Sequence, residues 1–236
     1  MAPESIYCAG TDPSAQERIA QSLALIRPLH LGQLEALTPT DRPSLLLLSP
    51  NSREEALIYR HMYHLRIALA VANPEEEAQI KDDHFLWAHL PTIHLDQPPQ
   101  ELAQQIERVF HQPVVLIVED HAEHQEAFAM AAAMTCASLG LRTNILVVNN
   151  TPAAIDISRS FNVSLLLVDQ RLRQSPPGTQ LIEKLFQQGL LPRQTHIMSA
   201  LDRPDFEPLE ETRLLRLQRD GADIRFLPKT ATDWVN

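Results

Sequence analysis

The sequence predicts an α/β fold built twice, as two doubly wound domains that each contain a parallel five-stranded sheet flanked by helices. Three observations support this fold class. Short runs of bulky apolar residues, such as residues 45–48 and 165–168, are bounded by turn residues and are typical of strands buried on both faces. Segments with the apolar spacing of helices separate these runs, which indicates parallel strands. The same order of elements then restarts after Gln112.

The first domain, residues 1–112, is expected to be a shortened version of this plan. Asp12 and Asn73 each precede a proline, a pattern typical of helix starts, and Ser52 with Glu55 has the spacing of a capping box. The strands predicted here are residues 6–9, 45–48, 67–71 and 92–95, with only a weak second strand near residues 29–31. The helices with clear apolar spacing are residues 15–26 and 100–111.

The second domain is expected to span residues 113–236, because Pro113 breaks the preceding helix. Its first helix is predicted to place Phe128, Ala132, Thr135 and Leu139 on one face. The strands predicted here are residues 114–118, 145–148, 165–168, 196–198 and 224–227.

Composition and charge disfavour several classes of function. The 236 residues carry a formal charge of −10, which disfavours binding to nucleic acid or to an anionic membrane, and no apolar run is long enough to cross a bilayer. The first residues lack the basic start and apolar core of a signal peptide. Cys8 and Cys136 stand far apart in unrelated contexts, so we expect reduced thiols in a cytoplasmic protein.

Four strands of the second domain end at residues with ionisable or hydroxyl side chains. The first strand is followed by Glu119 and Asp120, the third by Asp169, the fourth by Ser199 and the fifth by Lys229. Parallel strands place their carboxyl ends along one edge of a sheet, so these side chains are expected to gather there. Clustered carboxylates repel one another, and hard oxygen ligands suit Mg²⁺. Asp169 is then a candidate nucleophile that forms an aspartyl phosphate, stabilised by Lys229 and the Ser199 hydroxyl.

In this order and spacing, the motifs resemble the receiver domain of bacterial two-component response regulators, a flavodoxin-like fold. The resemblance covers residues 113–230 and rests on Leu-Ile-Val-Glu119-Asp120, Leu-Leu-Leu-Val-Asp169, Ile-Met-Ser199-Ala and Phe226-Leu-Pro-Lys229. It implies that a histidine kinase or a histidine phosphotransfer protein phosphorylates Asp169 in a phosphorelay. It also implies Mg²⁺-dependent self-phosphorylation and autodephosphorylation, with no enzymatic turnover of a separate substrate.

The resemblance further assigns roles to individual residues. Asp120, Asp169 and the main-chain carbonyl of Arg171 would bind Mg²⁺, and Glu119 would help through a water molecule. Ser199 would move toward the phosphoryl group while the aromatic ring of Phe226, which we expect in the core, changes rotamer. These movements together would form a two-state switch biased by one new charge.

Two departures from the family pattern concern the end of the chain. The family lysine is usually followed by proline, whereas Thr230 follows Lys229 and Pro228 precedes it. The family also has a fifth helix after this strand, where the present chain stops at Asn236. We therefore expect a fragment of a longer protein, and a C-terminal output domain and a homodimer both remain open.

The first domain resembles a degenerate receiver. Ser49 stands at the phosphoacceptor position, Ala9-Gly10 or Gly10-Thr11 at the acid pair, and Gln97 near the lysine position. Without carboxylates there is neither a Mg²⁺ site nor a nucleophile. We predict that this domain is not phosphorylated and serves as an interaction or dimerisation module.

Alternative functions remain open on the sequence alone. The chain could be a scaffold of two pseudo-receivers that is never phosphorylated, or an unrelated doubly wound enzyme that binds a nucleotide. The second alternative is disfavoured because no glycine-rich loop follows the first strand of either domain. His121 and His124 are interpreted as solvent-facing residues at a helix start rather than as ligands of a transition metal.

Overall fold

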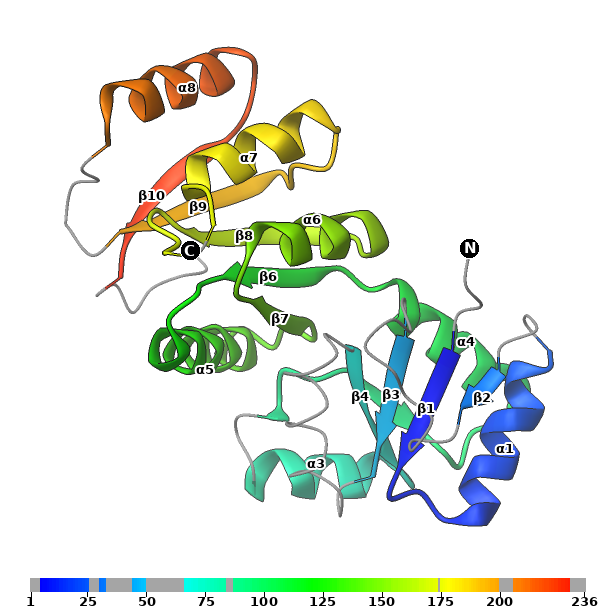
Figure 1. The fold of residues 1–236 in the computed structure, drawn as a ribbon. Helices are drawn as coiled ribbons and strands as arrows, with labels where there is room; N and C mark the ends of the chain where they lie inside the picture. Colours follow the sequence, from blue (N-terminus) through cyan, green and yellow to red (C-terminus); the bar gives the residue numbers. More distant parts are fainter. Residues whose placement is uncertain are drawn as a thin grey trace. The chain divides into compact units, whose positions relative to one another are not determined.

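The computed structural model describes residues 5–25, 30–32, 44–49, 66–83, 87–173, 175–199 and 206–229 (Figure 1). The chain divides into two compact units. The first comprises Met1–Gln112 together with Cys136–Asn144, and the second comprises Pro113–Thr135 together with Ile145–Asn236. Ser52, Thr230 and the chain end beyond it lie outside the described residues, so the predictions made for them stay predictions.

The first unit contains a five-stranded parallel sheet in the order β2-β1-β3-β4-β5. Its strands are β1 (Ser5–Ala9), β2 (His30–Gly32), β3 (Ser44–Leu48), β4 (Arg66–Val71) and β5 (Thr92–His94). Its helices are α1 (Pro13–Leu23), α3 (Pro74–Asp83) and α4 (Pro99–His111). The weakly indicated second strand is therefore present as the short strand β2, and Asp12 caps α1 by accepting from the main-chain N–H of Ala15 at 2.8 Å.

Helices cover both faces of this sheet. On one face, α1 and α4 pack on the strands through Ile19, Leu23, Leu102 and Ile106. On the other face, α3 packs through Ile80. The four leucines at residues 45–48 are all fully buried because successive side chains of β3 point to opposite, equally covered faces.

The second unit repeats the plan in the order β10-β9-β8-β6-β7 (Figure 1). Its strands are β6 (Val114–Val118), β7 (Asn144–Val148), β8 (Val163–Asp169), β9 (Gln194–Ser199) and β10 (Ile224–Pro228). Its helices are α5 (Ala122–Ser138), α6 (Thr151–Ser160), α7 (Gly178–Gln187) and α8 (Pro208–Arg219). Numbered within each unit, both sheets have the strand order 2-1-3-4-5 of flavodoxin-like folds. The predicted fold class is confirmed.

The core of the second unit also has two layers. One layer joins the sheet to α6, α7 and α8, and the other joins it to α5 through Phe128, Ala132 and Ala133. The prediction that this helix includes Leu139 is wrong, because α5 ends at Ser138; Leu139 is 51% exposed. Cys136, within α5, is buried.

A membrane-spanning helix needs a minimum length and a high hydropathy. Within the described residues, no helix combines the length and the apolar character needed to cross a membrane.

His196 of β9 gives the second unit a predicted pH dependence. Burial, and secondly the positive charge of Arg225, lowers the pKa of His196 below its ordinary value of 6.5, although Asp223 acts in the opposite direction. Unfolding raises this pKa again, so protons bind more readily to the unfolded chain, and stability falls as the pH drops through about 6.5.

We expect the free energy of unfolding to fall more in the parent than in His196→Leu between about pH 7 and pH 5. Urea denaturation followed by circular dichroism at both pH values measures this difference. Equal falls in the two proteins would contradict the prediction.

Candidate functional site

A pocket of about 480 Å³ lies at the carboxyl edge of the second sheet. Residues at the carboxyl ends of four strands, β6, β8, β9 and β10, reach this pocket. They meet there because the strands are parallel. The pocket is lined by Glu119, Asp120, His121, His124, Asp169, Gln170, Arg171, Arg173, Ser199 and Lys229. The structure thus brings the predicted acids, hydroxyl and lysine to one place.

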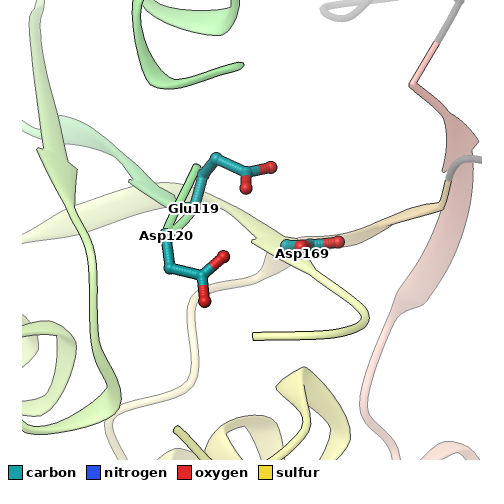
Figure 2. Close-up of side chains that lie close together, drawn as sticks. All are labelled: Glu119, Asp120 and Asp169. Carbon is teal, nitrogen blue, oxygen red and sulfur yellow. The ribbon is translucent and has the colours of Figure 1, made fainter. Parts of the chain in front are cut away.

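Three carboxylates form the centre of this pocket. Carboxylate oxygens of Glu119, Asp120 and Asp169 lie within 4.8 Å of one another. Figure 2 shows Glu119 and Asp120 at the end of one strand, with Asp169 beside them at the end of the neighbouring strand. Glu119 and Asp169 are buried, so water screens their mutual repulsion only weakly.

Lys229 contacts two of these carboxylates. Its Nζ lies 2.8 Å from Glu119 Oε2 and 3.1 Å from Asp169 Oδ1. The main-chain N–H of Lys229 donates to the carbonyl of Ser199 at 2.6 Å, which anchors the start of its loop to β9. The lysine side chain is only 14% exposed, so this loop holds its charge inside the pocket.

Neighbouring groups hold the acid pair in place. The main-chain N–H of His121 donates to Glu119 Oε1 at 3.0 Å, and Gln125 Nε2 donates to the Glu119 carbonyl at 2.5 Å. The main-chain N–H of Arg173 donates to Asp120 Oδ2. Sequence reasoning missed the parts played by Gln125 and Arg173, and no local pattern marks them.

The loop after Asp169 is tied back onto the sheet at both ends. The N–H of Gln170 donates to the Met198 carbonyl at 3.0 Å, and the N–H of Gly178 donates to the Gln170 carbonyl at 3.1 Å. Arg171, whose carbonyl was predicted to bind Mg²⁺, lies in this loop and lines the pocket.

The two predicted switch residues differ in burial. Ser199 is buried and lines the pocket, whereas Phe226 is 39% exposed. The expectation that Phe226 lies in the core is wrong, because β10 is the edge strand and leaves one side of the ring open. The Phe226 ring lies 5.3 Å from the ring of Phe206, measured between centroids. A rotamer change stays a prediction.

The interpretation of these two histidines as solvent-facing is confirmed for His124, which is exposed, whereas His121 is partly buried. Both line the pocket, and their ring centroids lie 4.6 Å apart. The His124 side chain is 46% exposed, yet its Nδ1 lies 3.4 Å from Lys229 Nζ.

The corresponding edge of the first unit has different chemistry. Ser49 follows β3, and its N–H donates to the Ala9 carbonyl at 2.9 Å. Gln97 presents its main-chain carbonyl to Arg18 at 3.2 Å. In the part of the chain that the structure describes, Glu119, Asp120 and Asp169 are the one group of three potential metal ligands found close together.

The donor set of the second unit fits Mg²⁺. It offers carboxylate oxygens, which are hard ligands, and it has no sulfur donor. The cluster holds three carboxylates, and Lys229 contacts two of them, so a divalent cation would relieve the repulsion that remains.

In outline, the second unit is a flavodoxin-like domain with an acidic pocket and a partly buried lysine. No protein-family model matches the chain, and no curated protein matches it. Similar solved structures include a putative two-component system response regulator/GGDEF domain protein, at 15% identity and a TM-score of 0.37 over 96% of this chain and 92% of that one.

Two further solved structures match the chain at similarly low identity. The Escherichia coli RcsC C-terminus, which contains a linker region and a phosphoreceiver domain, matches at 15% identity with a TM-score of 0.39 over 98% of this chain and 88% of that one. Full-length ShkA in complex with AMPPNP matches at 14% identity with a TM-score of 0.37 over 98% of this chain and 48% of that one. These low values leave function to be argued from the site itself.

Proposed function

We propose that the second unit is a receiver domain of two-component signalling that accepts a phosphoryl group on Asp169. The observation that carries this proposal is the contact of one partly buried lysine with two carboxylates of a three-carboxylate cluster. The phosphoryl donor would be a histidine kinase or a histidine phosphotransfer protein.

Each side chain has a task in this reaction. A carboxylate oxygen of Asp169 forms a bond to phosphorus while the bond from phosphorus to the donor's imidazole nitrogen breaks, and the leaving imidazole retains or takes up a proton. Lys229 stays beside Asp169 and offsets the negative charge of the phosphoryl oxygens. Ser199 contributes a hydroxyl from the end of β9.

Magnesium would be held by Asp120, Asp169 and the Arg171 carbonyl, with Glu119 assisting through water. Bound there, it would supply positive charge that neutralises the phosphoryl oxygens. Glu119 suits an indirect role because each of its two oxygens already accepts from a protein donor, the His121 N–H and the Lys229 ammonium.

The first unit would serve as an interaction module rather than as a second phosphoacceptor. Ser49 replaces the nucleophilic carboxylate, and the neutral Gln97 stands near the lysine position. A serine hydroxyl is a poor nucleophile without an adjacent general base.

The test is the intact mass of the full chain after incubation with acetyl phosphate and Mg²⁺. We expect one added phosphoryl group, which is lost on treatment with hydroxylamine because an acyl phosphate is cleaved by that reagent. EDTA should prevent its formation. A folded protein that gains no phosphoryl group and shows no heat of Mg²⁺ binding by calorimetry would refute the proposal in favour of a pseudo-receiver scaffold.

A further inference from the structure

Two aromatic side chains lie beside Lys229, and the phosphoacceptor chemistry does not by itself require them. His124 and Phe128 stand four residues apart on α5 and therefore lie on the same side of that helix. Their ring centroids are 5.7 Å apart. Lys229 Nζ lies 3.4 Å from His124 Nδ1 and 5.7 Å from the centroid of the Phe128 ring. The ammonium thus faces carboxylates on one side and two aromatic rings on the other.

We propose that His124, backed by Phe128, is a positioning residue that clamps the Lys229 ammonium in the pocket during phosphoryl transfer. This inference rests on the proposed function of Asp169. His124 does not touch the reacting atoms in this assignment; it acts through the lysine.

The proposed reaction changes the groups that surround the Lys229 ammonium, so contacts that do not change would help to position it. Before transfer, Glu119 and Asp169 hold the ammonium as an ion pair. Transfer converts the Asp169 carboxylate into an acyl phosphate, and a bound cation competes with the lysine for both acids. His124 and Phe128 contact the ammonium directly, and neither is an acid for which the cation competes. They keep a long, flexible side chain oriented when its original partners change.

The atoms are suited to this task. An ammonium has donors and no acceptor, so a hydrogen bond from Lys229 to Nδ1 of His124 requires the imidazole tautomer that carries its proton on Nε2. The Phe128 ring is buried in the core, so it cannot turn away from the lysine without disturbing that core. The negative face of the ring attracts the cation without offering a competing proton acceptor.

Two variants and one control separate positioning from a structural role. His124→Ala removes the acceptor, whereas His124→Asn returns an oxygen near the place of Nδ1. Met130→Ala is the matched control, because Met130 lies on the same helix with its side chain exposed and away from the pocket. All are made in the full chain and tested with acetyl phosphate and Mg²⁺.

We expect His124→Ala to lower the maximal rate of phosphorylation about ten-fold. His124→Asn should recover most of that rate, and Met130→Ala should match the parent. Mg²⁺ affinity, measured by calorimetry, should be unchanged. In a Lys229→Ala background, His124→Ala should cause no further loss, because the lysine through which it acts is gone. A further ten-fold loss in that background, or an equal loss of Mg²⁺ affinity, would overturn the clamp.

A second readout does not depend on phosphorylation. The chain has three lysines, Lys81, Lys184 and Lys229, so labelling by an N-hydroxysuccinimide ester can be followed at each one by peptide mass. Without metal or phosphodonor, His124→Ala should label Lys229 several-fold faster than the parent, with Lys184 unchanged as the internal reference.

The two readouts distinguish failure of the clamp from failure of the proposed function. If the parent is phosphorylated but His124→Ala reacts and labels at the parental rates, the clamp is wrong and the receiver function stands. If the parent never gains a phosphoryl group, the receiver function and the clamp's role in transfer both fall, whatever the labelling shows.

Discussion

The Asp169→Asn variant of the full chain should gain no phosphoryl group from acetyl phosphate under conditions where the parent gains one. The amide has nearly the size of the carboxylate, so packing at this buried position is kept. What is lost is the anionic nucleophile and one of the two carboxylates that contact Lys229. Intact-mass measurement reports the adduct, and circular dichroism reports the fold.

The same variant should still bind Mg²⁺, about ten-fold to a hundred-fold more weakly, because Asp120 and Glu119 remain. Asp220→Asn is the matched control, since Asp220 lies at the end of α8 outside the pocket. That control should be phosphorylated like the parent. An adduct on Asp169→Asn would place the nucleophile elsewhere and would contradict the assignment.

The fold could be predicted from the sequence because its signals are local and repeated. The leucine runs at residues 45–48 and 165–168 have the composition of strands covered on both faces, and both prove to be central strands. The strand order is less local, but the alternation of strands and helices limits it to a few arrangements.

The gathering of the acids and the lysine also follows from topology. Once β6, β8, β9 and β10 are parallel, the residues after them must share an edge. Their roles in phosphoryl transfer remain predictions. The carboxylate cluster is therefore the part of the site that strand ends alone can locate.

Other features of the site depend on three-dimensional detail that no spacing records. Arg173 contributes a main-chain N–H to Asp120, and any residue except proline could do so. His124 contacts Lys229 because α5 and the loop after β10 meet at the pocket, 105 residues apart in sequence. Phe226 has a core-like composition but lies on an edge strand. In each case, the surroundings of the residue depend on segments that are distant in the sequence.

Gly178→Ala should destabilise the second unit and impair the site at the same time. A Cβ at this position would lie 2.3 Å from the Asp169 carbonyl oxygen and 2.9 Å from Val168 Cγ2. The first contact is with main chain that is fixed in β8, so either the strand end or the start of α7 must move. Overpacking of this kind costs about 3 kcal/mol, the upper part of the usual range, because the obstacle is backbone.

The displaced strand end carries Asp169, so the damage should reach the chemistry. We expect Gly178→Ala to bind Mg²⁺ about ten-fold more weakly and to be phosphorylated correspondingly slowly, even at temperatures where it is fully folded. Urea denaturation measures the stability, calorimetry the Mg²⁺ affinity, and intact mass the phosphorylation.

Gly189→Ala, just beyond the other end of α7, separates the loss of stability from the loss of site geometry. Gly189 has φ +67, and a Cβ added there would meet nothing within 4 Å, so its substitution strains only the local backbone, by about 1–2 kcal/mol. That variant should lose stability and keep parental Mg²⁺ affinity once folded. If both glycine variants bind Mg²⁺ like the parent, the contact between Gly178 and Asp169 does not position the phosphoacceptor. If both bind it weakly, general destabilisation, rather than this contact, controls the site.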